Sequence, residues 1–102
     1  MTLRELQKQI KDLYTEYDRV LMNKPQSKEI LFIHLVEEVG ELAAQYVNQE
    51  HRKEKYSQEE VKNAIGDILI DALYLAEVLG VDSEPVIQKI IEEDRKTLQT
   101  KS

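Results

Sequence analysis

The side chains best suited to chemistry are acids in two separate segments of the chain. The first segment is the run EEVGE at positions 37–41, and the second contains Asp67 and Asp71. Hard cations such as Mg²⁺ prefer oxygen ligands in near-octahedral geometry, and carboxylates three residues apart on one helix can approach the same ion. The spacing therefore fits a divalent-cation site, provided that both segments are helical and face each other.

Helical geometry places these acids beside the apolar stripe of each expected helix. At about 100° per residue, Glu38 lies about 300° and Glu41 about 240° from the stripe of the first helix. Asp67 and Asp71 lie about 200° and about 240° from the stripe of the second. The two acidic edges could therefore meet across one groove. The alternative is that they are solvated acids, because glutamate is common on exposed helix faces.

Two glycines inside these helices also bear on the site. Gly40 lies within the first acidic run, and Gly66 directly precedes Asp67. Each costs about 1 kcal/mol relative to alanine in a helix interior, so a reason in packing or access is expected. Close approach of the two helices at these glycines would supply that reason.

Apolar residues at steps of three and four predict four helices that position these acids. The first is expected over roughly residues 3 to 22, after a capping box at residues 2 to 5. A break at residues 23–27 precedes the second helix, expected over roughly residues 28 to 49, and a polar loop then reaches residue 56. The third runs from a cap at Ser57 to Gly80, and the fourth, capped by Asp82 or Ser83, frays toward Ser102.

Length and composition predict a single all-α domain, a four-helix bundle. The chain has 102 residues, 33% of them charged, with few glycines and prolines and no cysteine. Short connections favour antiparallel neighbours, and the thin core leaves apolar surface to be covered. We therefore expect the bundle to be completed by oligomerisation, as a homodimer or homotetramer.

Charge and hydropathy argue against several classes of partner. The net charge of −6 disfavours binding to nucleic-acid backbones, which requires clustered lysine and arginine. No run approaches the roughly 18 apolar residues that cross a bilayer, and the N-terminus lacks the apolar core of a signal peptide. We expect a cytoplasmic protein without nucleic-acid or membrane partners, which would need metal ions to bind a phosphate-bearing substrate.

Two segments of the chain resemble a known family. They are LVEEVGELAA at positions 35–44 and AIGDILIDALYLAEVLGVD at positions 64–82, and together they look like the MazG-like nucleotide pyrophosphohydrolases of the all-α NTP pyrophosphatase group. Members carry the pattern EExxE followed by ExxD, and these acids bind Mg²⁺. In this chain the first half is complete, whereas Ala64 stands where the second half has its glutamate.

The resemblance implies a set of metal ligands. Glu38, Glu41 and Asp67 match family acids that hold Mg²⁺, for which Mn²⁺ is an expected substitute. Some members have an acid where this chain has Asn63, whose amide oxygen is a weaker ligand. Asp71, one turn after Asp67, is a further candidate that the family pattern does not assign.

The resemblance also implies a reaction. A nucleoside triphosphate would be cleaved between its α and β phosphates to give the monophosphate and pyrophosphate, as nucleotide-pool housekeeping. Metal ions would offset the charges and position a water for attack on the α-phosphorus. Glu37 and Glu38 are the candidates for catalytic roles, with Glu37 as a possible base.

Several other side chains are candidates for substrate binding. His34 lies one turn before Glu38 and could contact a phosphate, although a histidine on an exposed helix face often has no such role. Arg95 and Lys96 would reach the triphosphate if the last helix covers the groove; otherwise they are solvated cations near a helix C-terminus. The tyrosines that could stack on a base, or simply edge the core, are Tyr14, Tyr17 and Tyr46.

Two alternatives to an active enzyme remain open at this stage. Asn63 and Ala64 are consistent with a catalytically weak or inactive MazG-like module that binds nucleotide or metal, or that serves protein interactions. The chain could also be a purely structural helical dimer whose acids are surface charges.

Overall fold

A computed structural model describes residues 1–22 and 26–101 of the chain. Within these residues the structure is helical and contains no strand. The elements are α1 (Leu3–Tyr17), the π-helical turn η1 (Asp18–Met22), α2 (Lys28–His51), the 3₁₀ turn η2 (Lys53–Lys55), α3 (Gln58–Val78) and α4 (Ser83–Lys101). The predicted all-α class is confirmed. The break was predicted at residues 23–27: residues 26 and 27 are non-helical, whereas residues 23–25, like Ser102, lie outside the described residues.

Side-chain caps start three of the helices where the sequence predicted. The hydroxyl of Thr2 accepts a hydrogen bond from the Glu5 N–H at 3.1 Å, and Ser27 caps α2 in the same way at 3.2 Å. At its other end α3 stops where Gly80 adopts a φ of 73°, a conformation that suits glycine. The second helix is longer than predicted, because the backbone pairing continues through the polar residues to His51.

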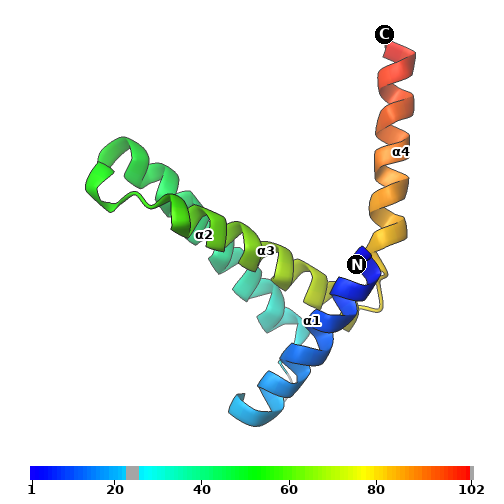
Figure 1. Cartoon of the computed structure of the whole chain (residues 1–102), viewed down its shortest axis with the longest axis horizontal. Helices are drawn as coiled ribbons and strands as arrows, with labels where there is room; N and C mark the ends of the chain where they lie inside the picture. Colours follow the sequence, from blue (N-terminus) through cyan, green and yellow to red (C-terminus); the bar gives the residue numbers. More distant parts are fainter. Residues whose placement is uncertain (23–25, 102) are drawn as a thin grey trace.

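The helices are arranged as a hairpin with two additions. Figure 1 shows α2 and α3 side by side and antiparallel, with α1 crossing against α3. Helix α4 joins this bundle through α1 and extends away from the hairpin. The acidic segments of α2 and α3 therefore lie on neighbouring helices, as the sequence predicted.

The core of the single chain is small and lies where α1 meets the hairpin. Its buried side chains are Ile10, Leu73 and Tyr74, against which Leu3, Tyr14, Leu31 and Ile70 pack. Many large apolar side chains are exposed, including Phe32, Val36 and Leu69. This surface fits the thin core expected from the sequence, and the oligomer that would cover it stays a prediction.

One fully buried polar side chain fixes the corner between α3 and α4. Gln7 has an exposed fraction of 0%. Its Nε2 donates to Glu77 Oε1 at 2.9 Å and to the Val81 carbonyl at 2.7 Å, and its Oε1 accepts from the Ser83 N–H at 3.2 Å. Arg4 also forms an ion pair with Glu77. Residues of α1 thus hold the segment from which α4 starts.

The prediction that the two helices approach closely at the mid-helix glycines is wrong within the described chain. A Cβ atom added at Gly40 or at Gly66 would meet no atom within 4 Å beyond the backbone of its own helix. The helices therefore do not approach closely at these positions, and nothing in the structure of the single chain explains the two glycines.

Candidate metal centre

Two contacts fix the register of the α2–α3 hairpin and bring its polar faces together. At one end His34 Nδ1 lies 2.7 Å from Asp71 Oδ2. At the other end the Ser57 N–H donates to Gln45 Oε1 at 2.9 Å. Four residues of α2 share one face because they recur at steps of four, three and four: His34, Glu38, Glu41 and Gln45. The acids of α2 therefore face α3 along the whole length between the contacts.

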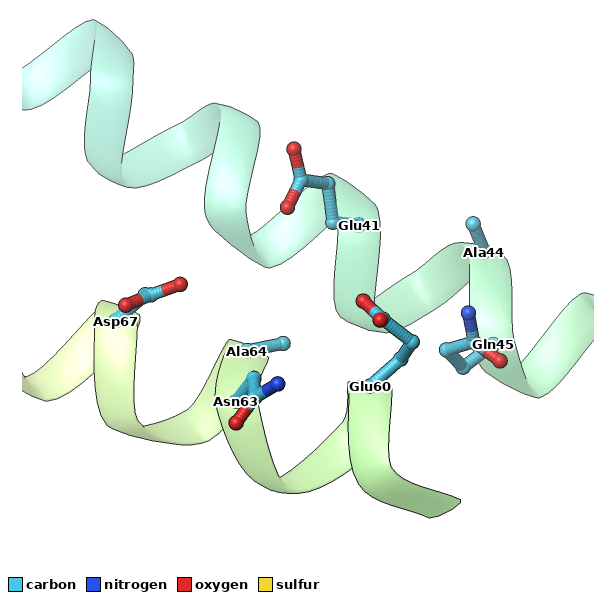
Figure 2. A pocket seen from close by; sticks show the side chains of 7 residues that line it. All are labelled: Glu41, Ala44, Gln45, Glu60, Asn63, Ala64 and Asp67. Carbon is cyan, nitrogen blue, oxygen red and sulfur yellow. The ribbon is translucent and has the colours of Figure 1, made fainter. Parts of the chain in front are cut away.

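The matching face of α3 carries the residues at positions 60, 64, 67 and 71. They recur at steps of four, three and four, so they share one side of the helix. Glu60, Ala64 and Asp67 from this face line a cavity of about 200 Å³ between the helices, together with Asn63, and Figure 2 shows their side chains. The α2 side of the same cavity is formed by Glu41, Ala44 and Gln45.

A compact group beside this cavity consists of His34, Glu38 and Asp71. One ligand atom from each lies within 4.8 Å of the others, a spacing at which they could hold a metal ion. His34 Nε2 is 3.6 Å from Glu38 Oε1. The sequence had ranked Asp71 as a secondary candidate, and the structure places it directly in this group.

Glu38 supplies the test of whether the site fits a cation. It is only 8% exposed, and its Oε2 is buried without a hydrogen-bond partner among the described residues. A buried carboxylate oxygen is strongly destabilising unless a donor or a cation satisfies it. The donor set around it is oxygen-rich, which suits Mg²⁺ or Mn²⁺, so the residues present fit a divalent cation.

The charges of the group also favour a bound cation. Burial raises the pKa of Glu38 above its ordinary value, and the negative charges of Glu41, Asp67 and Asp71 raise that pKa further, against the opposing effect of His34. Burial is also the largest cause of the raised pKa of Asp71. The site concentrates negative charge that a cation would neutralise.

His34 is held by its carboxylate neighbours. Burial lowers the pKa of its ring, but the hydrogen bond to Asp71 and the charges of Asp71, Glu38 and Glu37 outweigh burial and leave the pKa raised. The ring thus connects α2 to α3 at the edge of the acidic group. The sequence predicted its place beside Glu38 but not its contact with Asp71.

The remaining predicted residues lie outside this group. Glu37 is exposed and does not line the cavity. Arg95 and Lys96 lie on α4, which extends away from the hairpin, and Lys96 is 3.6 Å from Glu92 of its own helix. The basic pair therefore does not reach the groove of its own chain.

The tyrosines differ in their relation to the site. The Tyr14 ring lies 5.8 Å from both the Tyr17 and the Tyr74 ring, between centroids. Tyr14 packs against the core cluster; burial raises its pKa, and the charges of Asp67 and Asp71 raise it further. Tyr46 is exposed on α2 and makes no ring contact with the described residues.

Sequence reasoning missed two residues of the groove, Glu60 and Gln45. The signal for Glu60 was its spacing, one turn before Ala64 and two turns before Asp67 on the same helix face. Gln45 could have been found in the same way, one turn after Glu41. Neither residue belongs to the EExxE and ExxD patterns on which the predicted site is based.

Comparison with known proteins gives one match. The MazG nucleotide pyrophosphohydrolase domain matches residues 26–96, which include α2, α3 and most of α4. Searches of curated proteins and of solved structures each found no match. No helix in the described residues is long and apolar enough to cross a membrane. Because the match covers well over half of the sequence and both acidic helices, the chain belongs to the MazG nucleotide pyrophosphohydrolase family.

Proposed function

We propose that the chain is a Mg²⁺-dependent nucleoside triphosphate pyrophosphohydrolase that releases the nucleoside monophosphate and pyrophosphate. The observation that supports this most is the buried, unpartnered Glu38 Oε2 among the acids of α2 and α3. In the proposed reaction the oxygen of one water bonds to the α-phosphorus. The bond from that phosphorus to the α–β bridging oxygen breaks, and pyrophosphate leaves with the electron pair.

In this proposal the cation is held by the acids of the groove. Glu38, Glu41 and Asp67 are the principal ligands, with Asp71 and the Asn63 amide oxygen as further ones. Bound Mg²⁺, or Mn²⁺ in its place, offsets phosphate charge and activates water. Without it, an acidic chain of net charge −6 would repel a triphosphate.

The remaining residues are assigned by position. Glu37, next to Glu38 in the chain but exposed and outside the cavity, is proposed from the sequence alone as the base that takes a proton from the attacking water. His34, which contacts Asp71 and lies 3.6 Å from Glu38, is proposed to position these two side chains and to contact a phosphate. Arg95 and Lys96 could contact the triphosphate only from another copy, because α4 extends away from its own hairpin. We propose a homodimer or homotetramer for this reason and because of the exposed apolar surface.

Pyrophosphate release from a panel of nucleoside triphosphates with Mg²⁺ tests the proposal directly. An Asp67→Asn variant keeps the size of the side chain but removes a ligand charge, and we expect its kcat to fall about ten-fold or more. Asp94→Asn, on the exposed face of α4, is the matched control and should retain the parent rate. Absence of turnover by the parent chain with every nucleotide and both metals would refute the assignment.

The second candidate, a weak nucleotide-binding or metal-binding module, is favoured by Ala64, which stands where the family has a glutamate. Ala64→Glu separates the two candidates. A parent chain that binds nucleotide without hydrolysing it, and that gains turnover from Ala64→Glu, would be such a module. Comparable turnover in the parent and the variant supports the enzyme.

Metal binding should depend on pH in a defined direction. The pKa values of Glu38 and Asp71 are raised in the folded chain, so folding favours their protonated forms. Their contribution to metal-free stability is therefore present at low pH and is lost as pH rises through the folded pKa values. A cation needs both carboxylates deprotonated, so the rise in Tm produced by Mg²⁺ should grow as the pH rises above the ordinary carboxylate range toward neutrality. Thermal melts at a series of pH values measure this rise in Tm, and its dependence on pH should be smaller in Glu38→Gln. A rise in Tm that is independent of pH in the parent chain would contradict the prediction.

A further inference from the structure

We propose that Glu60 supplies the carboxylate that Ala64 cannot, and so acts as a further metal-binding residue of the acidic groove. This inference rests on the metal centre of the proposed function. It concerns a residue outside both acidic patterns, which the spacing of those patterns does not assign. The geometry of the cavity between α2 and α3 carries it.

Glu60 and Ala64 share one face of α3. They are four residues apart, and Asp67 continues the same face three residues later. Ala64 is 5% exposed, so the position lies inside the interface, but its methyl group contributes no ligand atom. A ligand from this side of the groove must therefore come from a neighbouring turn.

The short side chain of Ala64 leaves space between α2 and α3, and Glu60 enters this space. The cavity of about 200 Å³ is lined by Glu60 and Ala64 on one helix and by Glu41 on the other. Figure 2 shows the Glu60 carboxylate extending from α3 toward α2, into the space flanked by Asp67 farther along its own helix.

The N-cap of α3, which precedes Glu60, is tied to the opposite helix. The Glu60 N–H donates to the Ser57 hydroxyl at 3.2 Å. The N–H of Ser57 in turn donates to Gln45 Oε1 at 2.9 Å. Gln45 lies one turn after Glu41 on α2, so these contacts fix the start of α3 beside the acids of the other helix. Glu60 is thereby positioned over the cavity by hydrogen bonds that do not use its carboxylate.

Glu60 and its neighbour Glu59 are both exposed, but they differ in their partners. The Glu59 side chain is 74% exposed, and its carboxylate lies 3.9 Å from Lys62. Within the described part of the chain no lysine, arginine or histidine pairs with Glu60. The carboxylate that faces the cavity is thus left to another cation, on a cavity that Glu41 and Asp67 also line.

The test is a Mn²⁺ titration of the full chain followed by electron paramagnetic resonance, which reports metal binding without turnover. Glu60→Gln should weaken Mn²⁺ binding about ten-fold or more, the size of effect expected when a carboxylate of a metal site is lost. Glu59→Gln is the matched control, because it removes the same charge from the same helical turn, and it should change the affinity less than about two-fold. Adding Ala64→Glu to Glu60→Gln should restore the affinity.

Each outcome separates this inference from the proposed function. A Glu60→Gln chain that binds Mn²⁺ as tightly as the parent, or no more weakly than Glu59→Gln, overturns the role of Glu60 even if the parent hydrolyses nucleotides. A selective loss in Glu60→Gln that Ala64→Glu repairs supports that role even if no nucleotide is hydrolysed. A parent chain that binds no Mn²⁺ overturns the role of Glu60 together with the metal centre.

Discussion

A Glu38→Gln variant is expected to lose nucleotide turnover by about 100-fold or more and yet to be more stable than the parent chain when no metal is present. The two effects have one cause. Glu38 is buried with an unpartnered oxygen, and the charges of Glu41, Asp67 and Asp71 surround it. A glutamine keeps the shape, removes the repulsion and adds a donor for the neighbouring carboxylates.

The stability gain can be given a scale. A buried polar group without a partner destabilises a fold by about 1 to 3 kcal/mol, and relief of about 1 kcal/mol raises the Tm of a domain of this size by about 4 to 8 °C. Thermal melts in chelator should give the variant the higher Tm, and melts in excess Mg²⁺ should give the parent the higher Tm. The variant is the more stable chain without metal, and the parent gains more when metal is added.

Glu50→Gln is the matched control for Glu38→Gln, because Glu50 is exposed near the end of the same helix. It should leave both the rate and the Tm close to those of the parent. If Glu38→Gln melts below the parent in chelator, the buried carboxylate is satisfied in some other way. If it turns over nucleotide at the parent rate, Glu38 does not hold the cation.

The sequence was sufficient to predict the features that depend on local spacing. Helix starts followed from hydroxyl side chains at Ser27 and Ser57, and the end of α3 followed from Gly80. The acidic faces of α2 and α3 followed from residue spacing on a helix of known pitch. These predictions succeeded because a cap or a helix face is decided within a few residues of the chain.

The features that the sequence did not reveal depend on contacts between distant residues. Gln7 looks like any exposed polar residue of an amphipathic helix, and only the folded chain shows that it is buried against the α3–α4 corner. The contact of His34 with Asp71 and the position of Glu60 and Glu41 on one cavity likewise require the register of the hairpin. The direction of α4 could not be predicted, because its apolar stripe does not specify which neighbour it meets.

The substitution with the largest expected effect on stability is Gln7→Leu. Leucine fits a buried position but can neither donate nor accept, so the Val81 carbonyl and the Ser83 N–H would lose their partner, and Glu77 would keep only Arg4. Each buried group left without a hydrogen bond costs about 1 to 3 kcal/mol, and partial rehydration of the corner reduces the total, so we expect a loss of about 3 kcal/mol. Chemical denaturation should measure this loss.

The matched control is Gln9→Leu, which makes the same change on the exposed side of the same helix and should alter stability by less than about 0.5 kcal/mol. Amide hydrogen exchange distinguishes a local latch from a general packing residue. If Gln7 holds the corner, the Ser83 amide should exchange much faster in Gln7→Leu, while amides in the middle of α2 change only in step with global stability. Unchanged protection of Ser83 would mean that the corner is maintained by Gly80 and the ends of α3 and α4 alone. Gln7 would then contribute packing rather than the hydrogen bonds that set the direction of α4.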